Sequence, residues 1–380
     1  MNRKMIFWFS LALLVFFPAC AKQQQESPEN DYRVRPLDGG KSLEIIGYAG
    51  KKQSADIPSK LYGIPVTGMG KSVFQKKEII KVTIPKGVTA IGEAAFAGNL
   101  LTSVDIPNNV KTIGAEAFAG NLLAGVKFGS GVTVIGERAF TKNQLTGVTI
   151  PNSVTVIGEE AFWDNQIASV TIPGSVTAIG EWAFQKNQIT GVTITNGVTE
   201  IGTGAFFDNQ ISSVTIPDSV TTIGSEAFAG NPLTGLTLSP GNASFTARNS
   251  FLLSKDEKQI ILYFGAENDT AIPDGVTLIG AGAFSHKQLT GVTIPEGVTT
   301  IEYRAFRQNQ LTSITIPNSV TTIGDMAFVG NQITSITIGA NVSLGRSSLD
   351  DNSYFNYVYS NYGRRSGTYT LRNGYWSRQQ

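Results

Sequence analysis

Residues 145–166 read LTGVTIPNSVTVIGEEAFWDNQ, and variants of this 22-residue stretch fill most of the chain. Its phenylalanine, Phe162, returns every 22 residues from position 74 to position 228, and again from position 284 to position 328. Such repetition is typical of solenoid proteins, in which each repeat forms one coil that packs only against its neighbours. The repeated phenylalanines are Phe74, Phe96, Phe118, Phe140, Phe162, Phe184, Phe206, Phe228, Phe284, Phe306 and Phe328.

Each repeat predicts one coil of a β-rich solenoid. The segment Leu145–Ile150 is rich in β-branched residues, which favour strands, and Pro151 ends the strand because proline cannot donate a ladder hydrogen bond. A 22-residue unit cannot bury its apolar residues alone, so the stacked coils must share one core. We therefore predict a repeat solenoid with one short parallel strand per 22-residue coil, capped at both ends by β-hairpins.

Two columns of side chains are predicted to hold the coils together. Phe162 and Phe184 are the large core residues of their coils. An asparagine follows each of them by three positions, as Asn165 and Asn187, and its amide is expected to turn inward, because buried backbone groups need hydrogen-bond partners. These four residues are interpreted as structural.

The pattern Leu-x-x-Val-x-Ile-Pro-x-x-Val-x-x-Ile-Gly-x-x-Ala-Phe-x-x-Asn, as it stands in residues 145–165, resembles the treponemal-type (BspA-like) leucine-rich repeat of bacterial surface lipoproteins. The chain departs from that pattern where it carries Asn165, since many members of the family have Cys at this position. The resemblance implies a curved leucine-rich repeat solenoid. It also implies a surface-attached adhesin with no catalytic centre common to the family.

Composition argues against several classes of function. The 30 basic and 29 acidic residues nearly balance, so no net positive field favours nucleic acid. One cysteine and one histidine provide no ligand set for a metal bound by Cys or His, and little for acid–base catalysis. The histidine, His286, is expected to lie solvated on the surface. We predict no enzyme activity, no cofactor, no metal site and no nucleic-acid partner.

The N-terminus predicts export. The apolar run from Met5 to Phe17 is too short to span a bilayer but suits the hydrophobic region of a cleaved signal peptide. The motif FPAC, ending at Cys20, resembles a bacterial lipobox, in which the cysteine receives a lipid. Residues 1–19 are then a lipoprotein signal peptide and residues 20–31 a flexible tether, with the protein held by its lipid on the bacterial outer membrane, at the cell surface. A plain secretory signal with an incidental cysteine is the alternative.

Three segments depart from the repeat. Strand-like alternation around Gly39-Gly40 predicts a capping hairpin, and Asn373-Gly374 predicts another, with a type I′ turn. Residues 251–264 predict a hairpin that projects from the solenoid, either as a variant coil or as a protrusion that contacts a partner. The predicted order is an N-terminal cap (32–66), repeats (67–238), an irregular coil with a hairpin (239–271), repeats (272–340) and an aromatic, arginine-rich C-terminal cap (341–380).

Aromatic residues outside the core column are the candidates for partner binding. Trp163, Trp182 and Phe207 stand in consecutive repeats where other repeats carry small or polar residues, which predicts a partly exposed contact patch. The C-terminal segment adds further aromatic residues, which either cover the last coil or form a docking site, because Tyr and Trp dominate binding hot spots. Its candidates are Tyr357, Tyr359 and Trp376.

Two functions fit these observations. The favoured one is a surface-anchored, monomeric binding protein, similar to an adhesin, that contacts the host extracellular matrix, host cells or other bacteria. The alternative is a structural envelope lipoprotein without a specific partner.

Overall fold

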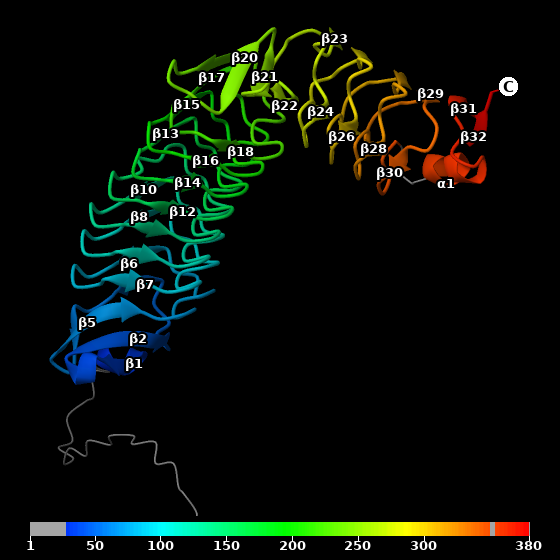
Figure 1. Cartoon of the computed structure of the whole chain (residues 1–380). Coiled ribbons are helices and arrows are strands. Elements are labelled where there is room, and N and C mark those ends of the chain that lie inside the picture. Colours follow the sequence, from blue (N-terminus) through cyan, green and yellow to red (C-terminus); the bar gives the residue numbers. More distant parts are fainter. Residues whose placement is uncertain (1–27, 350–353, 380) are drawn as a thin grey trace, which may run out of the picture.

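The computed structural model describes residues 28–349 and 354–379 and shows a curved rod of stacked coils (Figure 1). The two caps stand at opposite ends of the rod, and the rod bends near residues 245–263 (Figure 1). The predicted β-rich repeat solenoid is confirmed. The predicted signal peptide and Cys20 lie outside the described residues.

A column of short strands runs along one side of the coils, just before the glycine of each repeat. The strands pair in parallel with their equivalents in neighbouring coils, as Val156 of β12 pairs with Ala178 of β14. Within the described residues this column forms two ladders, one on each side of the insertion. The first is β7 (Ala90–Ile91), β9 (Thr112–Ile113), β11 (Val134–Ile135), β12 (Val156–Ile157), β14 (Ala178–Ile179), β16 (Glu200–Ile201) and β18 (Thr222–Ile223); the second is β24 (Leu278–Ile279), β26 (Thr300–Ile301), β28 (Thr322–Ile323) and β30 (Ser343–Leu344).

Most coils have a second strand, at the segment where the sequence predicts one. In the coil that begins at Leu145 this segment is not a regular strand, although Val148 and Ile150 are buried and Thr149 is exposed, as the period of two requires. Most coils therefore have two strands where we predicted one. The second column is β3 (Ser54–Asp56), β6 (Lys81–Thr83), β8 (Ser103–Asp105), β10 (Gly125–Lys127), β13 (Ser169–Ile172), β15 (Gly191–Ile194), β17 (Ser213–Ile216), β19 (Gly235–Leu238), β23 (Asp269–Ala271), β25 (Gly291–Thr293), β27 (Ser313–Thr315) and β29 (Ser335–Ile338).

The predicted N-terminal hairpin is confirmed. A 3₁₀ turn at Pro28–Asp31 leads into β1 (Tyr32–Leu37), which pairs antiparallel with β2 (Ser42–Tyr48) around Asp38–Gly40. β2 pairs in parallel with β5 (Ile64–Met69), which in turn pairs with β7, while the short β4 (Lys60–Leu61) pairs with β5. The cap thus extends the first ladder and covers its open end.

The phenylalanine and asparagine columns occupy the positions that the repeat predicts. Phe162 and Phe184 are fully buried, and their rings stack with centroids 5.2 Å apart. The Asn187 amide nitrogen donates to the carbonyls of Phe162 (3.0 Å) and Phe184 (3.1 Å), and its oxygen accepts the Ile167 N–H (3.0 Å). Asn165 makes the equivalent bonds one coil earlier. Each asparagine therefore ties its own coil to the coil before it.

The insertion forms an internal layer, so the predicted projection is wrong. β20 (Phe245–Arg248), β21 (Phe251–Ser254) and β22 (Gln259–Tyr263) pair antiparallel in sequence order. Leu252 packs into the core of the preceding coils and Leu253 into the core of the following coils, and both are fully buried. A strand buried on both faces cannot stand out in solvent. The hairpin instead separates two hydrophobic cores.

The C-terminal cap is a helix and a hairpin. α1 (Tyr354–Asn361) precedes β31 (Gly367–Arg372) and β32 (Tyr375–Arg378), and β31 pairs antiparallel with β29 of the last coil. Asn373 and Gly374 connect the two strands with φ of 50° and 84°, as a type I′ turn requires. The predicted hairpin is confirmed, and the helix was not predicted.

Candidate functional site

Residues on either side of each core phenylalanine form a surface that we call the loop face. Trp182 and Lys186, two positions before and two after Phe184, have φ of 55° and 54°. The N–H groups of Trp182, Phe184 and Lys186 donate to carbonyls of the next coil at 2.8, 2.8 and 3.0 Å. This backbone ladder leaves the Trp182 side chain half-buried and the Lys186 side chain exposed. The loop face is therefore built from side chains whose backbone is fixed.

Two of the three predicted contact residues meet on the loop face. The rings of Trp182 and Phe207 pack edge to face, with centroids 6.0 Å apart. Phe207 also packs edge to face on His286, at 5.1 Å. All three side chains are half-buried. We call Trp182, Phe207 and His286 the aromatic row.

Trp163 lies apart from the aromatic row. The ammonium groups of Lys142 and Lys186 lie over its ring, 5.2 Å and 5.4 Å from the centroid. A cation over an indole face is attracted by the ring quadrupole. The predicted patch of three aromatic residues is therefore one contacting pair and one separate, cation-bound tryptophan.

His286 is not the solvated residue that the sequence predicts. It is half-buried, and its Nε2 lies 3.2 Å from Nη1 of Arg307. Burial lowers the pKa of His286, and the nearby Arg307 charge lowers it further. The ring is then neutral near pH 7 and can accept the Arg307 hydrogen bond. No sequence signal linked His286 to Phe207, because the insertion separates their repeats.

A buried carboxylate joins the coils on the two sides of the insertion. The backbone ladder of the loop face reaches the Phe228 coil, where the Ala227 carbonyl accepts the Phe206 N–H. It begins again after the insertion, where the Ala283 carbonyl accepts the Tyr263 N–H. Between these two points, side chains connect the coils on the two sides of the insertion. Glu226, with 2% of its side chain exposed, accepts from Ser285 Oγ (2.7 Å) and Arg304 Nη1 (3.0 Å), and lies 3.6 Å from Arg307 Nη1. We call Glu226, Ser285, Arg304 and Arg307 the joint.

Lys287 adds a second link across the insertion. Its Nζ donates to the Leu233 carbonyl at 3.3 Å. Burial lowers the pKa of Lys287 to about 8, because the interior disfavours the charged form. The aromatic row therefore lies beside two polar contacts that join distant repeats.

The C-terminal candidates divide by burial. Tyr357 is 63% exposed, as a contact residue must be. Tyr359 is fully buried, and its hydroxyl donates to the Gly339 carbonyl (2.7 Å) and accepts the Val342 N–H (3.1 Å). Trp376 is also buried and packs edge to face on Phe355 at 5.2 Å. The prediction of partner binding is wrong for Tyr359 and Trp376, because both rings close the core of the last coil.

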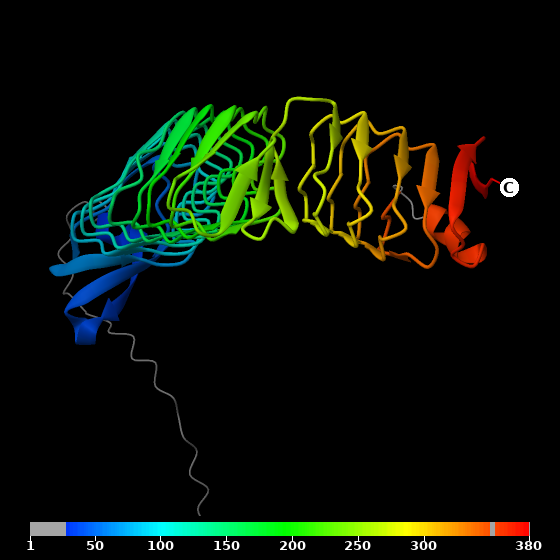
Figure 2. The same cartoon turned by 45° about the horizontal axis from the view of Figure 1, so that its top comes forward.

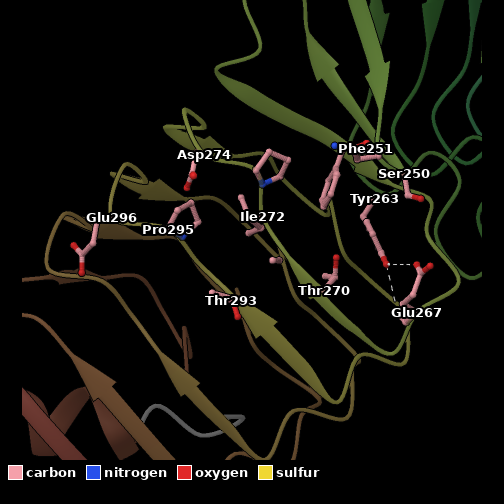
Figure 3. Close-up of a pocket in the computed structure, with 13 residues that line it drawn as sticks. Ser250, Phe251, Tyr263, Glu267, Thr270, Ile272, Asp274, Thr293, Pro295 and Glu296 are labelled. Carbon is pink, nitrogen blue, oxygen red and sulfur yellow. Dashed lines mark hydrogen bonds between the residues drawn. The ribbon is translucent and has the colours of Figure 1, made fainter.

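An open hollow of about 880 Å³ lies between the insertion and the coils that follow it (Figure 3). Three of its lining residues, Glu267, Asp274 and Glu296, are acidic, and none is basic. The Tyr263 hydroxyl lies 3.3 Å from Oε2 of Glu267, and burial raises the pKa of Tyr263. These carboxylates attract cations, and the lining contains no cysteine, histidine or lysine.

The described residues contain no cluster of His, Cys, Asp and Glu that can hold a metal ion. Over the same part of the chain, no helix has the length and apolar character needed to cross a bilayer.

Comparison with known structures places this architecture among bacterial leucine-rich repeat proteins. A leucine-rich cell-surface protein from Faecalibacterium prausnitzii is 24% identical, with a TM-score of 0.60 over 92% of this chain and 98% of the other. The pneumococcal vaccine antigen PcpA is 21% identical, with a TM-score of 0.51 over 84% of each chain. Both likenesses show the fold. Among curated proteins, none matches this chain.

The repeat sequence identifies the protein family more specifically than these structural similarities do. The model of the BspA-type leucine-rich repeat region matches in six copies, over residues 67–190, 183–264 and 264–362. These matches cover both sets of repeats, the insertion between them and the start of the C-terminal cap. With this match and with buried phenylalanines in the repeats on both sides of the insertion, the chain belongs to the BspA-type leucine-rich repeat family.

Proposed function

We propose that this protein is an exported, surface-anchored binding protein, similar to an adhesin, whose loop face contacts protein partners of the host matrix, host cells or other bacteria. The aromatic row is the observation that carries the proposal. Phe207 contacts both Trp182 and His286, and all three side chains remain partly exposed, on a face where most repeats carry small or polar side chains. Partly exposed aromatic groups are the side chains that most often dominate protein interfaces.

The same surface suits binding better than catalysis. The core phenylalanines and the asparagine amides are occupied in packing and backbone hydrogen bonds. The ring of His286 packs on Phe207 and its Nε2 lies 3.2 Å from Nη1 of Arg307, and neither of these partners is a nucleophile. Attachment through a lipid on Cys20 would place the solenoid at the cell surface, where a monomer can meet its partner without a membrane-spanning segment.

The triple variant Trp163→Ala/Trp182→Ala/Phe207→Ala tests the loop face. We expect its affinity for immobilised host matrix, measured by surface plasmon resonance, to be at least ~10-fold lower, because hot-spot side chains each contribute ~2 kcal/mol or more. The matched control is Thr149→Ala/Thr171→Ala/Thr193→Ala, which changes three exposed residues of the strand face and should bind like the parent. Equal binding by the aromatic variant, with its fold intact, would contradict the proposal; absence of saturable binding by the parent would favour the structural envelope alternative.

Protease treatment of intact cells tests the location. Trypsin added to whole cells should remove the protein while a periplasmic marker stays intact, because a lipid-anchored solenoid that faces outward is accessible. Replacement of Cys20 by serine should release the protein into the medium or leave its signal peptide uncleaved. Protection from trypsin until the outer membrane is permeabilised would contradict a surface location.

A further inference from the structure

The C-terminal cap has more aromatic residues than it needs to cover the last coil. Phe355, Tyr359, Tyr369 and Trp376 are buried and fill the open end of the second core. Tyr357, Tyr362 and Tyr375 are instead 63%, 43% and 68% exposed. Burial therefore explains the first group of rings, whereas much of each ring in the second group faces solvent.

The exposed side of the cap is also strongly basic. Residues 354–380 contain four arginines and no aspartate, glutamate or lysine, in a chain whose 30 basic and 29 acidic residues nearly balance as a whole. Arg364, Arg365 and Arg372 are exposed, and none of them forms an ion pair with another described residue. The guanidinium of Arg378 differs, because it donates to the Ser366 carbonyl at 2.7 and 3.0 Å.

The backbone that carries these arginines is anchored on the solenoid. The Arg364 carbonyl accepts the Asn341 N–H at 2.8 Å, and the Arg365 carbonyl accepts the hydroxyl of buried Tyr369 at 2.8 Å. Tyr362 rests edge to face on Tyr369, with centroids 5.9 Å apart. A surface whose backbone is held in place loses less conformational entropy on binding.

The cap lies at the end of the rod farthest from the N-terminal cap, in both views (Figures 1 and 2). The chain enters the described structure at residue 28, at the opposite end. A protein held through its N-terminus would therefore present this cap away from its own membrane.

We propose that Tyr357, Tyr362, Arg364, Arg365, Arg372 and Tyr375, the cap surface, form a docking site for an extended, Asp/Glu-rich segment of a partner protein. These residues follow the cap from α1, through the link to β31, to the turn of the β31–β32 hairpin, so the partner segment must span the length of the hairpin. Guanidinium groups bind carboxylates through paired hydrogen bonds, and these three form no ion pair with a described residue. Tyrosine adds broad contact area at low entropic cost, as it does in antibody paratopes. The inference deepens the proposed binding function but uses a different surface from the aromatic row.

The chemistry favours a protein over other anionic partners. A surface that binds lipid headgroups works with lysine as well as arginine and lies against the membrane, whereas this cap has only arginine and lies far from the anchored end. The combination of exposed tyrosine with arginine is typical of protein interfaces.

The test measures binding of a fluorescein-labelled decaglutamate peptide to the full chain by fluorescence anisotropy, at low and high salt. The variant Arg364→Gln/Arg365→Gln/Arg372→Gln should bind at least ~10-fold more weakly, because it loses three charged hydrogen-bond donors, whose contribution is reduced by solvent screening. The matched control Lys51→Gln/Lys52→Gln/Lys60→Gln removes the same charge from exposed sites at the opposite end and should bind within ~2-fold of the parent. A second variant, Tyr357→Ser/Tyr375→Ser, should also weaken binding, and this part of the loss should persist at high salt.

The proposal for the cap surface would be overturned if the parent protein showed no measurable binding of decaglutamate. An equal loss of affinity in the lysine control would also overturn it. So would tighter binding of a sulfated polysaccharide, or of anionic phosphatidylglycerol vesicles, than of the peptide. The Trp163→Ala/Trp182→Ala/Phe207→Ala variant should bind decaglutamate like the parent. A negative result for the cap surface therefore does not affect the test of the loop face, and a negative result for the loop face does not affect the test of the cap surface.

Discussion

Phe184→Ala is expected to lower the free energy of unfolding by about 3–5 kcal/mol, the usual cost of truncating a buried phenylalanine. Phe184 is fully buried, and its ring lies between those of Phe162 and Phe206, with centroids 5.2 Å and 5.5 Å away. The cavity would be closed on both sides by stacked rings and by the asparagine hydrogen bonds, so the coils cannot collapse around it easily. Guanidinium denaturation followed by circular dichroism measures the loss.

The control for this variant is Gln188→Ala, four residues away and exposed, which should change stability by less than ~0.5 kcal/mol. Repeat proteins unfold as coupled neighbouring units, so a cavity in mid-solenoid should also broaden the transition by weakening the coupling between the two sides. A loss below ~1 kcal/mol would contradict the buried column, since truncation of a buried phenylalanine costs more.

Glu226→Ala is expected to cost about 3 kcal/mol, the lower end of the range for breaking a buried ion pair. The carboxylate is almost completely buried and pairs with Arg304 and Arg307, whose side chains are 25% and 26% exposed. Because both arginines are partly exposed, water can solvate their charges once the carboxylate is removed, so we expect the cost in unfolding free energy to be at the lower end of the range. The Ser285 hydroxyl also loses its acceptor. Chemical denaturation measures the change.

The surface variant Arg248→Gln is the matched control, because it breaks the exposed pair with Glu257 and should cost less than ~1 kcal/mol. Hydrogen exchange distinguishes a local loss from a loss of coupling. In Glu226→Ala, amides of residues 272–349 should exchange faster than those of residues 67–200, because the joint replaces the interrupted backbone ladder. Equal costs for the two variants would show that the joint does not couple the coils.

The joint also bears on the proposed binding surface. Phe207 and His286 belong to repeats on opposite sides of the insertion, and their contact requires the joint to hold those repeats together. A variant that opens the joint should therefore weaken partner binding through the aromatic row without altering any of its residues. The cap surface, which lies at the end of the rod, should be unaffected in the same protein.

The roles of the repeated residues could be predicted from the sequence. Phe184 and Asn187 have the same neighbours in each coil, because stacking repeats one local arrangement, so their roles follow from spacing alone. The two capping hairpins could also be predicted, since Gly39-Gly40 and Asn373-Gly374 specify turns locally. The internal position of the insertion could not, because apolar residues such as Leu252 and Leu253 also suit a strand with one exposed face.

Contacts between repeats that are distant in sequence could be found only in the folded protein. The joint links Glu226 to Arg304 across 78 residues, and the aromatic row links Phe207 to His286. The 22-residue repeat pattern predicts neither contact. Tyr357 and Tyr359 have the same residue type, yet one is exposed and the other is buried, because residues two apart point to different sides of α1 and the side that carries Tyr359 is buried. A repeat specifies how one coil follows the next, whereas such single contacts depend on how elements outside the repeat pack against it.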